Sequence, residues 1–391
     1  MAGSPSGEVT EDSDVVGGAG RFAVENARLV TPETVIEDGH LVVEGDRIAS
    51  VGPGAAPTDG PALDLAGRIV VPGLIDLHGD DIDRHCAPRP EASVEPETAR
   101  VTCERENVAA GITTKYHALA FEDAPEDGRS PERAAAIADV LRGADKTLID
   151  HRVHARCEIG NERCVESVLD LLDSDPPDMV SLMHHAPGTG QFDDRRAFER
   201  RYAGENPVLG RRTSDGTLEG RVEQMIEHAC ATGVPVASHD DDDPAAVERR
   251  AELGVDLFEY PVTMAAAARA TDLGVLTAMG APNLLRGGSL WDNLDAPAAI
   301  EAGVVDVLCS DYHPHALLES IFVDTGEPLT ERVARATSAP ADIAGLDDRG
   351  RLVAGKRADL AVIDPGTRYT VQRVFVAGQE TFRARPTRRR G

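Results

Sequence analysis

The sequence predicts a (β/α)8 barrel combined with a small β-sandwich domain that is built from both ends of the chain. The chain has 391 residues, more than one small core needs, so we expect one large domain and a smaller one. The middle, residues 71–350, alternates strand-like and helix-like segments, whereas residues 21–70 and 351–385 contain mainly strand-like runs. These observations give the expected division into a barrel and a terminal β domain.

The first element is a polar tail, residues 1–20, with the sequence MAGSPSGEVTEDSDVVGGAG. It has neither the basic n-region nor the apolar h-region of a signal peptide, so we expect a disordered acidic tail and a cytoplasmic protein. Strand-like runs then follow between Gly and Asp turns: RFAVENARLV, HLVVEGDRIASVG and ALDLAGRIVVPG. The other end of the chain resumes the pattern with RLVAGKRADLAVID and YTVQRVFVAGQETF. One sheet domain made from both ends is therefore expected, and two unrelated β-appendages are the alternative.

Apolar runs in the middle of the chain supply eight candidate strands: GLIDLH, GITTKYHAL, DHRVHARCE, DMVSLMHH, VPVASHD, VDLFEYPVT, LGVLTAMG and VVDVLCSD. Most are separated by polar segments with helical periodicity, such as EGRVEQMIEHACAT. Eight strands that alternate with helices predict a closed barrel, and a doubly wound sheet is the alternative if one strand is miscounted. No stretch of about 18 uninterrupted apolar residues occurs, so we expect no membrane span.

The chain is strongly acidic, with a formal net charge of -28 from 68 acidic and 40 basic residues. Only Lys115, Lys146 and Lys356 are lysines. An acidic surface poor in lysine is typical of proteins from high-salt cytoplasm, where the screening length is about 3 Å at 1 M salt, so we expect a halophilic protein. Without a basic excess we expect no nucleic-acid partner. The six cysteines include no C-x-x-C, which favours free thiols.

Titratable residues collect at the ends of the candidate strands. His78 and Asp80 of the first strand are two residues apart, so their side chains point to the same side. Other strands end in or lead to further residues of this kind: His154, Arg156, Glu158, His184, His185, His239, Asp240, Glu259, Asp311, His313 and His315. The carboxyl ends of barrel strands converge on the face that carries catalytic residues. Any single residue has an ordinary structural explanation, but together they favour a metal site.

Carboxylates combined with imidazoles suit divalent zinc, manganese or iron. We expect zinc first, with manganese and iron as alternatives, and one or two ions. Such an ion lowers the pKa of bound water towards about 7. A neighbouring carboxylate then acts as a base or proton shuttle. The expected chemistry is therefore hydrolysis.

The motif PGLIDLHGD (72–80), the terminal-strand pair Ser310–Asp311 and GKRADLAVID (355–364) resemble the amidohydrolase superfamily. More specific segments resemble its phosphonate-metabolism branch: LHGDDIDRHCAPRP (77–90), HARCE (154–158), SLMHHAPGTGQF (181–192), ASHDDDD (237–243) and GAPNLLRGGS (280–289). The resemblance covers residues 21–385. It implies hydrolysis of alpha-D-ribose 1-methylphosphonate 5-triphosphate to the 5-phosphate and diphosphate, within the carbon–phosphorus lyase pathway of phosphonate catabolism. The implied partner is a phosphorylated small-molecule substrate.

The resemblance also implies roles for particular residues. The implied metal ligands are His78, Asp80, Glu158, His239, Glu259 and Asp311. Asp311 is also the implied general base. Glu259 stands where many relatives carry a histidine, so it is either a ligand or a carboxylate that orients a neighbour. A carbamylated Lys115 is disfavoured, because this lysine lies on the second strand and not on the fourth.

Phosphate groups need hydrogen-bond donors, and two segments offer them. Arg286, Gly287, Gly288 and Ser289 combine a guanidinium, a hydroxyl and open backbone N–H groups. A second basic patch, beside the first ligands, consists of Arg84, His85 and Arg89. We also expect His185 to contact the substrate. The alternative for each arginine is an ordinary ion-paired or solvent-facing side chain.

Two single positions and one run of four residues depart from the family pattern. His184 stands where aspartate is usual, Asp81 where asparagine is common, and residues 114–117 (Thr-Lys-Tyr-His) replace a more apolar run. These departures leave the roles of His184 and Lys115 open and allow a shifted substrate. Two other functions also stay open: an amidohydrolase or deaminase acting on a C–N bond of a cyclic substrate, and a non-catalytic scaffold subunit. A homo-oligomer is neither required nor excluded.

Overall fold

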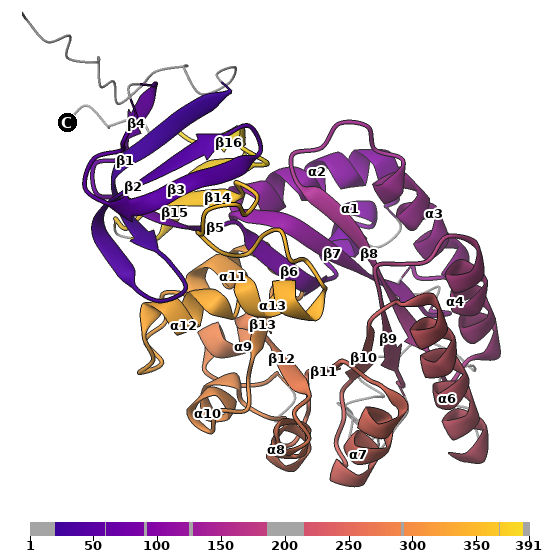
Figure 1. Cartoon of the computed structure of the whole chain (residues 1–391). Helices are drawn as coiled ribbons and strands as arrows, with labels where there is room; N and C mark the ends of the chain where they lie inside the picture. The colour runs from indigo at the N-terminus through magenta and orange to yellow at the C-terminus, as the bar shows by residue number, and fades with distance from the viewer. Residues whose placement is uncertain are drawn as a thin grey trace, which may run out of the picture.

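The computed structural model describes residues 20–385 except 59, 90–91, 125–127, 186–214, 291–292 and 367. It contains a parallel barrel sheet surrounded by helices and, beside it, a separate mixed sheet with strands from both ends of the chain (Figure 1). The predicted fold class is therefore confirmed. The expected acidic tail lies outside the described residues, except for Gly20.

The mixed sheet joins the two ends of the chain. Its strands are β1 (Arg21–Val30), β2 (Val35–Glu44), β3 (Arg47–Pro53), β4 (Ala62–Asp64), β5 (Ile69–Pro72), β14 (Leu360–Asp364), β15 (Thr370–Val376) and β16 (Gln379–Arg383). The order is β16-β15-β14-β5-β1-β2-β3, and β4 pairs with β1. The antiparallel pair β5–β14 places Val70 opposite Val362, which ties the C-terminal strands to the N-terminal ones. The rings of Phe22 and Phe375 stack in the core, with centroids 5.4 Å apart.

One residue, Gly73, separates β5 from the first strand of the barrel sheet. Its strands are β6 (Leu74–Gly79), β7 (Ile112–Phe121), β8 (Asp150–Glu158), β9 (Met179–Met183), β10 (Val236–His239), β11 (Leu257–Glu259), β12 (Leu276–Gly280) and β13 (Val307–Cys309). Neighbours in the chain pair in parallel throughout. A parallel bridge between Gly79 and Asp311 brings the end of β13 to the end of β6, so the barrel is nearly closed.

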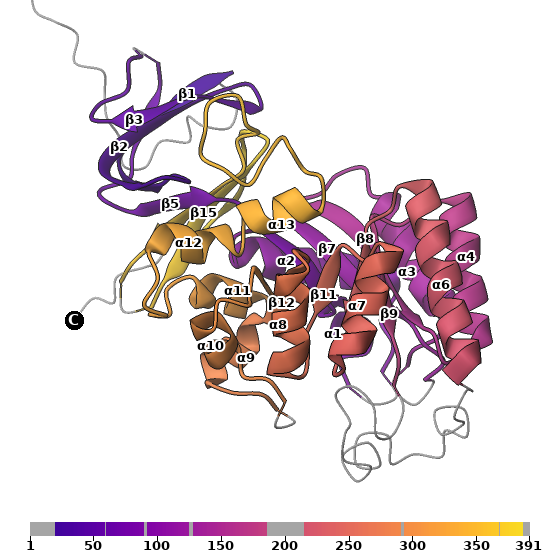
Figure 2. The ribbon, with the colours of Figure 1, turned by 60° about the horizontal axis from the view of Figure 1, so that its bottom comes forward.

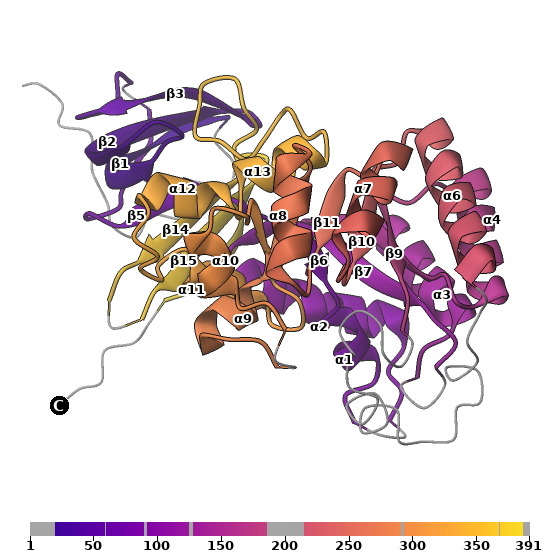
Figure 3. The same cartoon turned by 90° about the horizontal axis from the view of Figure 1, so that it is seen from below.

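Helices cover the outside of the barrel, as Figures 2 and 3 show. Their bounds are α1 (Ile82–Cys86), α2 (Pro96–Ala109), α3 (Pro131–Arg142), α4 (Glu162–Ser174), α6 (Asp215–Thr232), α7 (Pro244–Leu253), α8 (Met264–Asp272), α9 (Ala281–Arg286), α10 (Ala296–Glu301), α11 (Pro314–Ser320), α12 (Leu329–Ala334) and α13 (Ser338–Ile343). Several begin at a capping side chain that accepts from a first-turn N–H, including Ser130 and Asp243. Within the described part of the chain, no helix combines the length and apolar character needed to cross a membrane.

Candidate metal centre and active-site cavity

Parallel barrel strands end at a common face, which brings distant residues together. His78, His154 and Glu259 come from β6, β8 and β11, and their donor atoms lie within 4.8 Å of one another. His78 Nδ1 lies 3.1 Å from Glu259 Oε2, and His154 Nε2 lies 3.9 Å from the same oxygen. All three side chains are buried. We call them the first donor group.

The protonation of the first donor group suits a metal site. Burial lowers the pKa of His154 to about 4 and holds the pKa of His78 well below its ordinary value, with the charge of Arg156 adding to the effect on His78. Both imidazoles are therefore neutral at neutral pH, as metal ligands must be. His154 Nδ1 lies 2.9 Å from the carbonyl oxygen of Leu77, and this contact directs Nε2 towards Glu259. Among the described residues, His154 Nε2 and Glu259 Oε1 have no hydrogen-bond partner. The group thus offers buried donor atoms that fit a cation.

A second donor group consists of Glu122, Glu158 and His185, at the ends of β7, β8 and β9. His185 Nδ1 lies 3.3 Å from Glu122 Oε1 and 3.2 Å from Glu158 Oε2. Burial alone would lower the pKa of His185, but the two carboxylates raise it to about 10. His184 Nδ1 is 3.2 Å from the other oxygen of Glu158. Glu158 and His78, both predicted as metal ligands, therefore belong to different groups of donor atoms.

Asp80 and Asp311 meet where the barrel closes. The backbone N–H of Asp80 donates to the Asp311 carbonyl, and that of Asp311 donates to the His78 carbonyl, both at 3.0 Å. Burial, reinforced by the Asp80 carboxylate, raises the pKa of Asp311 to about 7. The Asp80 carboxylate itself lies 3.6 Å from Arg156 Nη1 and 3.8 Å from Arg129 Nη2. Two acidic groups with different environments therefore line one site.

His239 lies close to the first donor group. Its ring centroid is 5.3 Å from that of His78 and 5.1 Å from that of Tyr260. Its Nδ1 is 3.0 Å from the carboxylate of Asp240. Asp240 and Tyr260 directly follow β10 and β11, and Asp311 lies two residues beyond the end of β13. The φ values of these three residues are 60°, 53° and 57°. This left-handed backbone is uncommon for residues other than glycine and is often found at functional sites.

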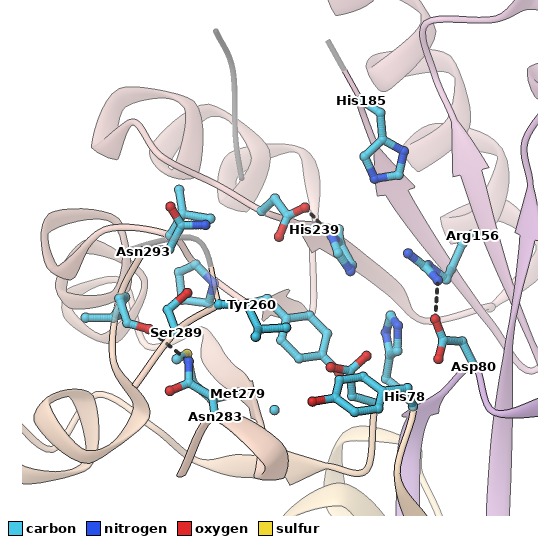
Figure 4. A pocket seen from close by; sticks show the side chains of 18 of the residues that line it. His78, Asp80, Arg156, His185, His239, Tyr260, Met279, Asn283, Ser289 and Asn293 are labelled. Carbon is cyan, nitrogen blue, oxygen red and sulfur yellow. Dashed lines mark hydrogen bonds and ion pairs between the residues drawn. The ribbon is translucent and has the colours of Figure 1, made fainter. Parts of the chain in front are cut away.

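A cavity of about 290 Å³ opens beside these residues (Figure 4). Its lining contains His78, Asp80, Arg129, Arg156, His185, His239, Asp240, Tyr260, Met279, Asn283, Arg286, Ser289, Asn293, Asp311 and Tyr312, with further apolar residues. Basic and acidic side chains thus face the same space at the carboxyl ends of the strands. A concave site with a few convergent polar groups is the usual form of a small-molecule site.

The two predicted phosphate-binding segments lie in different places. Arg286 and Ser289 line the cavity, and Gly287 ends α9 with φ 75°. Gly288 precedes Ser289, whose backbone N–H donates to the Asp295 carboxylate at 2.8 Å. This N–H therefore already has a partner within the protein.

The other predicted segment faces away from the cavity lining. Arg84 and His85 lie on α1, and both contact Glu106 of α2, with His85 Nε2 at 3.1 Å. Arg89 is exposed after this helix. The structure does not bring these three residues to the cavity.

Lys115 lies outside the donor groups, in a buried ion network. Its Nζ is 2.6 Å from Asp76 Oδ2, 2.9 Å from Asp81 Oδ1 and 3.0 Å from Ser310 Oγ. Burial alone would lower its pKa, but the two carboxylates hold the pKa well above the ordinary value. Asp81 also belongs to a third set of clustered donor atoms, with His85 and Cys103, but the ammonium already supplies a cation there. The charged amine has a structural partner on each side, which disfavours carbamylation.

Gly79 permits this arrangement, because a Cβ atom at its position would lie 1.7 Å from Lys115 Nζ. The glycine between His78 and Asp80 is therefore needed for the packing of the network behind the site.

His154, Arg156, Arg129 and Glu122 are among the cavity or donor residues to which the sequence assigned no individual role. The first two share the period-2 face of β8 with Glu158, so strand alternation was a usable signal. Glu122 directly follows β7, a strand-end position like those of the other candidates, but the predicted strand GITTKYHAL ended at Leu119 and left it out. Arg129 lies in the loop after β7, where strand alternation gives no signal.

The chain resembles several curated proteins, although no model of a known protein family matches it. It is 30% identical over 362 residues to an alpha-D-ribose 1-methylphosphonate 5-triphosphate diphosphatase of Escherichia coli (strain K12), which covers 87% of this chain and 94% of that protein. It is 26% identical over 415 residues to an imidazolonepropionase of Paracoccus denitrificans (strain Pd 1222), covering 93% of this chain and 98% of that protein.

Solved structures share the fold at low sequence identity. An N-acetylglucosamine-6-phosphate deacetylase from Pasteurella multocida has a TM-score of 0.63 at 16% identity and covers 92% of this chain and 99% of its own. A dihydropyrimidinase from Brevibacillus agri has a TM-score of 0.62 at 13% identity and covers 93% and 95%.

The barrel, its donor groups and the similarity to the diphosphatase lead to one assignment. The chain belongs to the amidohydrolase superfamily and is a metal-dependent hydrolase. Within that superfamily, it is similar over nearly its whole length to the E. coli alpha-D-ribose 1-methylphosphonate 5-triphosphate diphosphatase.

Proposed function

We propose that this chain is a metal-dependent diphosphatase, which hydrolyses alpha-D-ribose 1-methylphosphonate 5-triphosphate to the 5-phosphate and diphosphate in phosphonate catabolism. The observation that carries this proposal is the 30% identity to the E. coli enzyme of that name, over 87% of this chain and 94% of that enzyme. The cavity adds support, because three arginines face it together with the candidate metal donors. A highly charged substrate needs such cations.

The residues present fit a divalent metal ion. His78, His154 and Glu259 offer two neutral imidazoles and a carboxylate, and two of their donor atoms have no other partner among the described residues. Zinc binds such nitrogen and oxygen ligands, and manganese and iron accept them too. We assign this first donor group as the holder of the ion. When bound, the metal polarises a phosphoryl oxygen and makes hydroxide available at neutral pH.

Other predicted ligands complete the proposed metal centre. Asp80, His239 and Asp311 line the cavity next to the first donor group. Glu158 belongs to the second donor group, which is the proposed place for a second ion where two are bound.

Asp311 is the proposed general base. Its carboxylate faces the cavity, and its backbone N–H is fixed to the His78 carbonyl of β6. In the metal-free chain, burial and the neighbouring Asp80 carboxylate raise its pKa to about 7. The assignment as base rests on its position, because a carboxylate beside the metal site accepts a proton from the attacking water. Arg286, Ser289 and His185 face the same cavity and are the proposed donors to substrate oxygens.

The competing function is hydrolysis of a C–N bond by the same site. It is supported by similarity to an imidazolonepropionase at 26% identity and to an adenine deaminase at 22% identity. A non-catalytic scaffold is the weaker competitor. A scaffold has no use for buried donor atoms without partners, which reduce stability.

Product analysis separates these functions. The metal-loaded chain is incubated with the ribosyl methylphosphonate triphosphate, with a nucleoside triphosphate and with a cyclic amide, and phosphorus NMR follows diphosphate. We expect diphosphate from the ribosyl substrate and a decrease in rate of about 10²- to 10⁴-fold in a folded Asp311→Asn variant. Hydrolysis of the amide without any diphosphate would establish the C–N alternative.

A further inference from the structure

Arg156 stands between the two donor groups. It lies on β8 with His154 on one side and Glu158 on the other, and residues at i, i+2 and i+4 of a strand share one face. His154 belongs to the first donor group and Glu158 to the second. Figure 4 shows the guanidinium between His185 and Asp80, at the side of the cavity. A ligand next to Arg156 would therefore be adjacent to both groups.

The hydrogen-bond donors of Arg156 are largely unused by the protein. The side chain is only 7% exposed. Its Nε and Nη1 atoms have no hydrogen-bond partner among the described residues, and its one ion pair there, with Asp80, measures 3.6 Å. That distance is too long for a hydrogen bond. Buried polar groups are nearly always satisfied, so an acceptor from a ligand is the partner that this guanidinium lacks.

The other arginines of the cavity have protein partners. Arg129 Nε lies 3.0 Å from Asp83 and its Nη1 lies 3.2 Å from Glu122. Arg286 is exposed, and its Nη1 donates to the hydroxyl of Tyr312. Among the described arginines of this cavity, Arg156 is therefore the one whose guanidinium has buried nitrogen atoms without a hydrogen-bond partner.

The chemistry of the cavity indicates which ligand this is. Asp80, Asp240 and Asp311 face the same space, and the chain carries a net charge of -28, so an anion needs a local cation to enter. A planar guanidinium donates two parallel N–H groups to two oxygens of one phosphoryl group.

We propose that Arg156 binds phosphoryl oxygens of the substrate and is the specificity-determining cation of this cavity. The inference rests on the proposed function for the identity of the anion. A positioning role towards Asp80 alone is the alternative, and it predicts a change in stability or metal content without a change in anion affinity.

The test is the affinity of the full-length, metal-loaded chain for inorganic diphosphate, measured by titration calorimetry. The variants are Arg156→Gln, which removes the charge, and Arg156→Lys, which keeps the charge but removes the planar fork. The matched control is Arg163→Gln on α4, which removes one positive charge from a side chain that is 50% exposed and outside the cavity lining. Melting temperature and metal content are measured for every variant.

We expect Arg156→Gln to weaken diphosphate binding by about 10- to 100-fold, as the loss of charged hydrogen bonds predicts. Arg156→Lys should bind with intermediate affinity, and Arg163→Gln should match the wild type. Equal affinity of wild type and Arg156→Gln, at equal metal content, would overturn the inference and leave the proposed function standing. Failure of the wild type to hydrolyse the triphosphate would instead overturn the proposed function. Because the binding measurement needs no turnover, it still decides the role of Arg156.

Discussion

Replacing Lys115 by methionine removes a cation that pairs with two buried carboxylates. Its Nζ lies 2.6 Å from Asp76, 2.9 Å from Asp81 and 3.0 Å from the Ser310 hydroxyl, and the lysine and both aspartates are fully buried. Loss of one partner from a buried ion pair costs about 3–5 kcal/mol, because the other charge stays buried and unpaired. Unfolding entropy of about 2.1 cal/mol/K per residue makes each kcal/mol worth a little over 1 °C in a chain of this length. The melting temperature should therefore fall by about 4–6 °C.

Thermal unfolding of wild type and Lys115→Met at one pH and salt concentration measures this change. Lys146→Met is the matched control, because Lys146 is exposed in the loop after α3 and should leave the melting temperature unchanged. A Lys115→Met protein that melts within 1 °C of the wild type would refute the reasoning that the ammonium stabilises this network.

Three further predictions concern metal, pH and salt. Glu259→Gln should lower metal affinity by about 10-fold or more, because it removes the charge of a buried donor group. The measurement is the metal content after dialysis, and a content equal to that of the wild type would exclude Glu259 as a ligand. The pKa of Asp311 is raised from 3.8 to about 7, so this group favours the folded state at low pH. The free energy of unfolding of the metal-free wild type should therefore fall as pH rises from about 4 to 7, by at most about 1.4 kcal/mol per pH unit more than that of Asp311→Asn. Parallel plots of unfolding free energy against pH for the two proteins would contradict this. Activity and stability should rise towards molar salt, and a protein that is most stable and active in dilute buffer would disprove the halophilic expectation.

The arrangement of the barrel could be predicted because strand order alone fixes where its residues meet. Alternation of strand and helix patterns gave the eight strands, and parallel strands share one carboxyl-end face. That logic placed His78, His239 and Asp311 on a common cavity. It needed no knowledge of side-chain contacts.

Contacts that depend on the direction in which a helix or loop carries a side chain could not be predicted in the same way. Arg84 and His85 follow His78 closely in sequence, but α1 turns them towards Glu106 of α2. Glu158 was expected beside the other ligands, and its carboxylate instead contacts His184 and His185 from the end of β9. Helix direction and loop geometry, which the residue pattern does not encode, decide these contacts.

The most direct test of the account is whether diphosphate release depends on metal. The wild-type chain is stripped of metal with a chelator, supplied again with zinc, manganese or iron, and assayed with the ribosyl methylphosphonate triphosphate at each stage. We predict that diphosphate release disappears on metal removal and returns when at least one of these ions is restored. Release that continues unchanged in metal-free protein, or no release from the fully loaded protein, would contradict the account.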